Sequence, residues 1–85
     1  MQNELEPKGL LQELIYHLVD YPDQVNIFSN ETAHTATFDI EVAEDDVGKV
    51  LGRRGSHAEA LRVVFGAIYG KLGKRVHLQV IDPRR

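Results

Sequence analysis

The sequence contains no cysteine and no long hydrophobic run. Without cysteine it can form neither a disulfide nor a cysteine–zinc site, and this absence fits a reducing compartment. It has no apolar run of about 18 residues and no basic-then-apolar leader. We therefore expect a soluble cytoplasmic protein without membrane insertion. The 85 residues are enough for one domain but too few for two hydrophobic cores.

Positive charge is almost absent from the first half of the chain. Residues 1–47 hold eleven acidic residues and one cation, Lys8, for a net charge of −10, whereas residues 48–85 hold nine cations and two acids, for a net charge of +7. The total of −3 conceals this segregation. A segregated protein can present a positive face to nucleic acid, because the local field matters more than the total. The alternative is a pair of ordinary solvated faces.

Spacings typical of metal or catalytic sites are also missing. The acidic run Glu44-Asp45-Asp46 fits the first turn of a helix, where carboxylates interact favourably with the helix dipole. No nucleophile is paired with a base, so we expect no enzymatic activity, no metal and no cofactor. The histidines are scattered and do not form a motif such as H-E-x-x-H. They are His17, His34, His57 and His77.

Hydrophobic periodicity predicts the element order α-β-β-α-α-β. The predicted elements are helices over 8–19, 44–51 and 56–72 and strands over 25–29, 35–42 and 76–80. In the strand over 35–42, alternate residues are apolar and face one way, namely Ala36, Phe38, Ile40 and Val42. The last two strands flank a helix pair, and such a crossover makes them parallel. We expect a three-stranded mixed sheet with three helices on one face.

The predicted helix over 56–72 combines an apolar stripe with small residues. The stripe consists of Ala58, Leu61, Phe65, Ile68 and Leu72. The small residues are Gly66, Ala67 and Gly70, and Val63, Val64 and Tyr69 lie off the main stripe. Small residues allow a second copy or another protein to approach closely, and an 85-residue chain gains from burying more apolar surface. The alternative is that they pack the helix on its own sheet.

Between the last two predicted helices lies Gly52-Arg53-Arg54-Gly55. Two glycines three apart permit a tight turn whose backbone can approach a ligand closely. Ser56 and Glu59 have the spacing of a capping box, which would start a helix at the turn and direct its free amides and dipole toward an anion. A GXXG loop that clamps a nucleic-acid backbone is a feature of the KH domain. The alternative is an ordinary helical connection with solvated arginines.

With this element order, the run from Val42 to Gly55 and the ending from Lys74 to Asp82 resemble the KhpA (YlqC-like) family of small bacterial single-KH-domain proteins. The resemblance covers essentially the whole chain and implies one type II KH domain, of the α+β class, over residues 1–85. It implies an RNA chaperone or post-transcriptional regulator that self-associates and pairs with a KhpB-like KH protein. It also implies a link to cell elongation and envelope (peptidoglycan) homeostasis. One departure is Arg54, where the family often has an uncharged polar residue, and this favours phosphate attraction over selectivity.

The expected RNA-binding residues lie in two basic segments. They are Lys49, Gly52, Arg53, Arg54, Gly55, Ser56, His57, Lys71, Lys74 and Arg75. The resemblance implies that the segment around Lys74 faces the glycine loop across a groove. The backbone of the edge strand around Leu78 would then offer donors and acceptors to bases. The lysines could instead be merely solvated, and Arg62 could face either the groove or water.

The sheet surface is not expected to bind RNA. Phe38 and Phe65 lie on apolar stripes, whereas an RNA-binding sheet of the RRM type needs exposed aromatics. The outward residues Asp39 and Glu41 would repel phosphate. Two functions of different classes therefore remain: a module that binds single-stranded RNA, about four nucleotides per domain, and a protein-interaction module whose KH fold mediates homo- or heterodimerisation.

Overall fold

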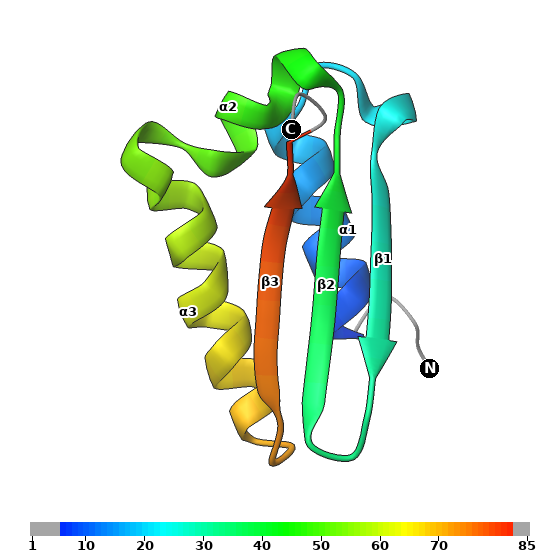
Figure 1. Cartoon of the computed structure of the whole chain (residues 1–85), viewed down its shortest axis with the longest axis vertical. Helices are drawn as coiled ribbons and strands as arrows, with labels where there is room; N and C mark the ends of the chain where they lie inside the picture. Colours follow the sequence, from blue (N-terminus) through cyan, green and yellow to red (C-terminus); the bar gives the residue numbers. More distant parts are fainter. Residues whose placement is uncertain (1–5, 83–85) are drawn as a thin grey trace.

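The computed structural model describes residues 6–82, which form a three-stranded sheet with helices packed on one face (Figure 1). The predicted element order is confirmed, with short 3-10 turns between the main elements. The helices are α1 (Pro7–Leu18), α2 (Val47–Leu51) and α3 (Ser56–Gly70), and the strands are β1 (Asn26–Glu31), β2 (Thr35–Glu41) and β3 (Arg75–Ile81).

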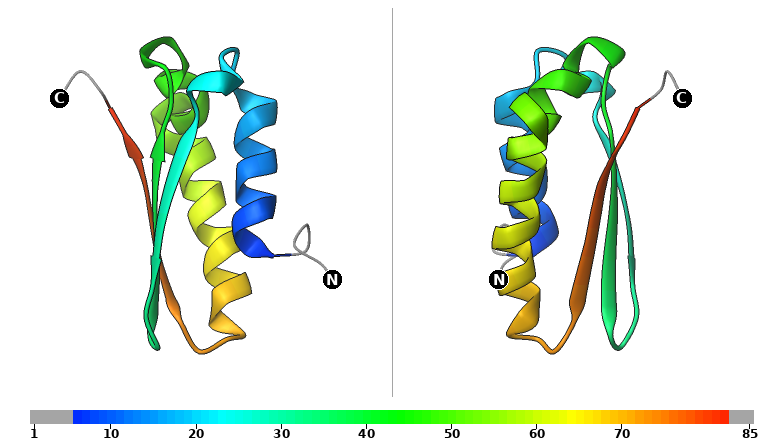
Figure 2. Two further views of the ribbon diagram at one scale, coloured as in Figure 1. Left: turned by 90° about the vertical axis from the view of Figure 1, so that its right-hand side faces the viewer. Right: turned by 60° about the vertical axis from the view of Figure 1, so that its left-hand side comes forward.

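The sheet has the order β1-β2-β3, so β3 is an edge strand. β1 pairs with β2 in the antiparallel direction, and β2 pairs with β3 in the parallel direction. The predicted parallel crossover is therefore confirmed. Figure 2 shows α1 and α3 in one layer behind the sheet, and the opposite face of the sheet is open. The glycine loop lies at the upper end of α3, beyond the edge of the sheet (Figure 1).

The core lies between the sheet and this helical layer. The alternation predicted for β2 is confirmed, because Ala36, Phe38 and Ile40 are buried and their neighbours are only partly covered. The helices contribute Leu11, Ile15, Val47, Val50, Ala58, Leu61 and Phe65. Apolar side chains from all three helices therefore hold α2 and α3, and the loop between them, against the sheet.

The end of α3 differs from the predicted pattern. Helix α3 stops at Gly70, and Gly73 has a φ of 75°. The chain turns away there, because the N–H groups of Leu72 and Lys74 both donate to the carbonyl of Tyr69. As a result Leu72 is 60% exposed, whereas Tyr69 is only 3% exposed and its ring lies 5.8 Å from that of Phe38. The prediction that Leu72 belongs to the core and Tyr69 to the outer surface is wrong.

Asp46 is a buried carboxylate that links α1 to α2. Its two oxygens accept hydrogen bonds from the backbone N–H groups of Asp20 and Tyr21, each at 3.0 Å. Both donors lie just beyond α1, while Asp46 directly precedes α2. The acidic run does begin the helical segment as expected, and the structure adds this second role for its last member.

The two glycines of α3 do not serve its packing against the sheet. A Cβ atom built at Gly66 or Gly70 meets nothing within 4 Å. The small residues therefore border open space, and the alternative in which they allow close packing of α3 on its own sheet is wrong.

Within residues 6–82, no helix is long and apolar enough to cross a membrane.

Candidate nucleic-acid interface

The glycine loop has a backbone conformation that its sequence makes possible. Gly52 and Gly55 have φ angles of 77° and 76°, in the region that favours glycine. Arg54 between them also has a positive φ, 57°, which costs a residue with a Cβ about 1–2 kcal/mol. The turn is closed by the N–H of Gly55, which donates to the carbonyl of Gly52 at 3.0 Å. The sequence therefore maintains a strained, tight loop at the start of α3.

His57 fixes the position of this loop. Its Nδ1 lies 2.8 Å from the carbonyl oxygen of Lys49, and because a carbonyl only accepts, Nδ1 carries the hydrogen. The contact joins the first turn of α3 to the end of α2. A Cβ at Gly52 would lie 2.4 Å from Cγ of His57, so only glycine fits beside the ring. Sequence reasoning offered His57 as an RNA contact and missed this positioning role.

The capping box expected at Ser56 and Glu59 does not form. Ser56 is the first residue of α3, and Gly55 stands at the N-cap position in a left-handed conformation. No side chain caps the helix, and Glu59 lies 3.6 Å from Nη1 of Arg62. Because Gly55 takes the N-cap position, the helix starts at Ser56, one residue earlier than it would with Ser56 as the cap. The N-terminal turn of α3 is left without a side-chain acceptor, and its dipole favours a negative ligand there.

The cations near the loop fall into two groups. Arg53 and Arg54 are exposed, and within residues 6–82 neither forms an ion pair. Lys49, in contrast, lies 3.3 Å from Asp20 and 3.7 Å from Asp46. The Asp20 carboxylate, with help from Asp46, raises the pKa of the Lys49 ammonium above its ordinary value. The charge of Lys49 is partly compensated, whereas the two arginines direct theirs to solvent.

The second basic segment lies at the opposite end of α3 (Figure 1). Lys71 follows α3 directly, and Arg75 begins β3. Fifteen helical residues, about 22 Å of helix, separate this end from the glycine loop. Lys74 is paired with Glu31. The expected arrangement, in which this segment faces the glycine loop across a groove, is therefore wrong, because the two clusters lie at the two ends of one helix.

Arg62 lies toward β3. Its Nε donates to the carbonyl oxygen of Leu78 at 3.0 Å. The side chain borders an open depression of about 560 Å³ that also includes Thr37, Asp39, His77 and Gln79. β3 is an edge strand as predicted, and the carbonyl oxygen expected to be available at Leu78 already accepts one hydrogen bond from Arg62.

The chain matches the family model described as "KhpA/KhpB, KH domain" over residues 8–80. The chain belongs to this KH-domain family. Proteins named "RNA-binding protein KhpA" are similar to it over most of their length. The relative from Halalkalibacterium halodurans is 39% identical, covering 88% of this chain and 99% of its own. The relative from Streptomyces coelicolor is 43% identical, covering 85% and 90%, and that from Borreliella burgdorferi is 36% identical, covering 94% of both chains.

This KhpA/KhpB-type domain has an apolar groove on its helical face. The groove runs between α1 and α3 and measures about 310 Å³. Its lining comprises Leu14, His17, Leu18, His57, Ala60, Leu61 and Val64. Val64 is 49% exposed and Leu14 is also exposed, as expected for Val64 from its place off the core stripe. Among residues 6–82, no segment covers this patch of apolar surface, which lies on the side away from the sheet.

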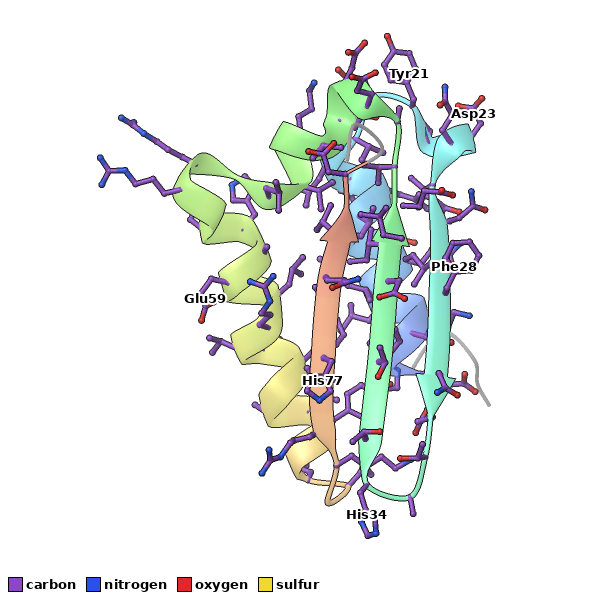
Figure 3. All side chains as sticks on the ribbon, in the orientation of Figure 1. Tyr21, Asp23, Phe28, His34, Glu59 and His77 are labelled. Atoms are coloured by element: carbon purple, nitrogen blue, oxygen red, sulfur yellow. The ribbon has the colours of Figure 1, made fainter. Side chains whose placement is uncertain are left out.

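The open face of the sheet differs in chemistry from both of these surfaces. Phe28 on β1 is 56% exposed and pairs in register with Asp39 of β2. Figure 3 shows Phe28 and His77 on this open side. Asp39 and Glu41 make the face acidic, as the alternation predicts.

Among residues 6–82 there is no group of three His, Cys, Asp or Glu side chains able to hold a metal.

Proposed function

We propose that this chain binds single-stranded RNA and uses the loop Gly52–Gly55 as a phosphate clamp. The observation that carries the proposal is the placement of two exposed arginines, without an ion-pair partner among residues 6–82, on a tight loop at an N-terminal helix end that has no side-chain cap there. Backbone amides and guanidinium groups both donate to phosphate oxygens, and arginine can do so through two parallel bonds. The name of the relatives, "RNA-binding protein KhpA", supports this assignment.

The residues of the clamp have different tasks in this proposal. Arg53 and Arg54 contact phosphate, Gly52 and Gly55 allow close approach of the strand, and Ser56 and His57 offer backbone amides of the first helical turn. His57 in addition holds α2 and α3 together. Lys49 adds to the local field but, because of its ion pairs, contributes less than the arginines.

A GXXG loop clamps about four nucleotides of an RNA strand. An RNA strand that leaves the loop and follows the edge of β3 approaches the second basic segment, where Lys71 and Arg75 are exposed. Lys74 takes a smaller part, because it is paired with Glu31. The proposal therefore includes the second segment as an auxiliary contact for a longer RNA.

The cellular role follows from the family resemblance. We propose that the protein acts in the cytoplasm as a non-enzymatic RNA chaperone or post-transcriptional regulator. It would do so with a KhpB-like partner, in the control of cell elongation and envelope (peptidoglycan) homeostasis. Membership of the KhpA/KhpB family supports the pairing of two KH proteins.

The apolar groove between α1 and α3 favours a second function, protein interaction. Leu14 and Val64 are large apolar side chains exposed on the same groove. Burial of such surface stabilises association by about 25 cal/mol per Å² before the entropy cost of association. We propose this helical face as the surface for a second KH domain, either a second copy of this chain or the KhpB-like partner. Both functions can coexist, because the lining of the groove does not include Arg53 or Arg54, although His57 borders both the groove and the loop.

The RNA proposal is tested by the double substitution Arg53→Ala/Arg54→Ala. Affinity for a fluorescein-labelled oligouridine of twelve nucleotides should fall at least about tenfold, because two charge-assisted contacts are lost. The matched control is Arg84→Ala/Arg85→Ala, which removes the same two charges elsewhere in the sequence and should cost less. Equal losses in both variants would mean that net charge, not a clamp, governs binding. Circular dichroism verifies that both variants are folded.

A further inference from the structure

The edge of β3 carries a side chain arrangement that the phosphate clamp does not use. Arg62 projects from α3 to β3 and donates through Nε to the backbone carbonyl of Leu78 at 3.0 Å. This bond fixes the guanidinium at the edge of the sheet and uses one of the two lone pairs of the Leu78 carbonyl oxygen. What remains for a ligand is the donor face of the guanidinium, since Nε is only one of its five N–H donors.

The free end of this guanidinium is only weakly engaged. Its Nη1 lies 3.6 Å from a carboxylate oxygen of Glu59, beyond ordinary hydrogen-bond distance, and both side chains are solvent-exposed. Exposed ion pairs of this kind contribute little to stability, so a ligand with good acceptors can replace Glu59. The two terminal nitrogens are thus presented together, in a plane set by the bond to Leu78.

The depression beside Arg62 holds groups suited to a nucleobase. Its volume of about 560 Å³ is bordered by Arg62, Asp39 and His77, with Leu78 at its edge. His77 lies on the open side of β3 (Figure 3) and offers a ring on which a base can stack. Asp39 offers a carboxylate acceptor. Its charge repels phosphate, but a base is neutral and can donate to it.

These three groups discriminate between bases. Guanine presents two adjacent acceptors, O6 and N7, that match two guanidinium N–H donors, and its N1–H and N2–H groups match a carboxylate. Adenine presents the acceptor N7 beside the donor N6–H₂. N7 can accept one guanidinium N–H, but the N6–H group would face the second guanidinium N–H, and these two donors would remain unpaired. Cytosine has two adjacent acceptors, O2 and N3, but it has no second edge with two adjacent N–H donors for the Asp39 carboxylate.

We infer that Arg62 is a specificity-determining residue that selects guanine at the edge of β3, with Asp39 and His77 completing the base site. This inference rests on the proposed RNA binding, because the loop delivers the strand to the depression. It contrasts with the loop itself, where arginines contact phosphate and distinguish no sequence.

The test measures the affinity of three eight-nucleotide RNAs, (UG)₄, (UA)₄ and (UC)₄, by fluorescence anisotropy at one salt concentration. The unaltered protein should bind (UG)₄ about tenfold more tightly than the other two, the usual discrimination of one bidentate contact. In Arg62→Lys, which keeps the charge but loses the planar pair of donors, the preference should fall below about threefold, with affinity for (UA)₄ unchanged. The matched control Glu59→Gln removes the ion pair but not the donors and should keep the preference.

A second arm changes only the RNA. Replacement of guanosine by 7-deazaguanosine, which lacks the N7 acceptor, should remove most of the preference in the unaltered protein, so the test does not depend on a variant that folds. Equal binding of the three RNAs, tighter binding of (UC)₄, or a preference that survives in Arg62→Lys would overturn the base selection and leave RNA binding intact. Failure to bind any of the three would overturn both the inference and the proposed function.

Discussion

At the scale of single residues, the glycine loop depends on two glycines for different reasons. Both have φ near 76°, but a side chain at Gly55 meets open space, whereas a Cβ at Gly52 meets the His57 ring and its backbone nitrogen at 2.4 and 2.7 Å. Consequently any side chain at position 52 changes the shape of the loop. The substitutions Arg53→Ala and Arg54→Ala remove charge and hydrogen-bond donors and leave both glycines in place.

Gly55→Ala should therefore be the milder of two substitutions. We expect it to lower the free energy of unfolding by about 1 kcal/mol, the cost of a left-handed residue with a Cβ. Gly52→Ala should cost more, about 2–3 kcal/mol, because the clash with backbone adds to the strained φ. Urea denaturation measures both, and equal costs would argue against the role given to His57.

The buried carboxylate of Asp46 provides a second prediction at this scale. Asp46→Asn keeps the shape but replaces one of two acceptors by a donor facing a backbone N–H and removes the charge near Lys49. We expect a loss of about 2 kcal/mol in the free energy of unfolding. Asp45→Asn, at the exposed neighbouring position, is the control and should change it by less than about 0.5 kcal/mol. Similar values for the two variants would contradict the link between α1 and α2.

At the scale of elements, α3 connects the two ends of the proposed RNA path, and its interior glycine is open to substitution. Gly66→Ala should raise the free energy of unfolding by about 0.5–1 kcal/mol, because alanine restricts the unfolded chain and fits the helix without contact. Thermal unfolding of the isolated protein checks this. A destabilised variant would show that the space beside Gly66 is used in the folded state.

Near the C-terminal end of α3, Tyr69 makes the free energy of unfolding depend on pH in the alkaline range. Burial, with the Glu31 and Glu6 carboxylates, raises the pKa of the Tyr69 hydroxyl above its ordinary value of 10.0. The folded state therefore disfavours tyrosinate. The contribution of Tyr69 to the free energy of unfolding is fully present below pH 10 and is lost as the pH rises through the raised pKa. Tyr69→Phe should show a smaller loss of stability between pH 9 and about 11 than the unaltered protein. Parallel pH profiles would contradict the effect of burial.

The elements themselves follow from local patterns, whereas several contacts of the site do not. Alternation located β2, and helical spacing located α1 and α3, because one buried face imposes each period. The spacing of Ser56 and Glu59 predicts a capping box that does not form, because Gly55 occupies the N-cap position. The contacts of Asp46 with Asp20, and of Arg62 with Leu78, join residues 26 and 16 positions apart, so no local pattern encodes them. The buried stripe continues from Phe65 to Tyr69, four residues on, while the turn after Gly70 takes Leu72 out of it.

At the scale of the whole molecule, the segregation of charge in the sequence becomes a segregation of surfaces. The exposed arginines lie at one end of α3, the acidic residues of β2 face the open side of the sheet, and the apolar groove lies on the helical side. One domain can thus offer RNA and a protein partner different surfaces, which adjoin at His57.

Self-association through the apolar groove is tested with two adjacent valines of α3. Val64→Glu places a charge in the groove, whereas Val63→Glu places the same charge at an exposed position outside its lining. Val64→Glu should shift the protein to monomer in sedimentation equilibrium at micromolar concentration, since a buried unpaired carboxylate is costly. Val63→Glu should leave the association unchanged. A monomeric unaltered protein, both alone and mixed with a KhpB-like partner, would contradict the use of this groove.

The central claim is that the glycine loop binds RNA through phosphate contacts, and the salt dependence of RNA affinity tests it most directly. Contact with about three to five phosphates predicts a slope of log affinity against log salt of about −2 to −3.5, from roughly −0.7 per phosphate on single strands. Arg53→Ala/Arg54→Ala should flatten that slope by up to about 1.4, and Lys8→Ala should leave it unchanged. An affinity independent of salt, or a slope that the arginine substitutions leave unaltered, would contradict the clamp.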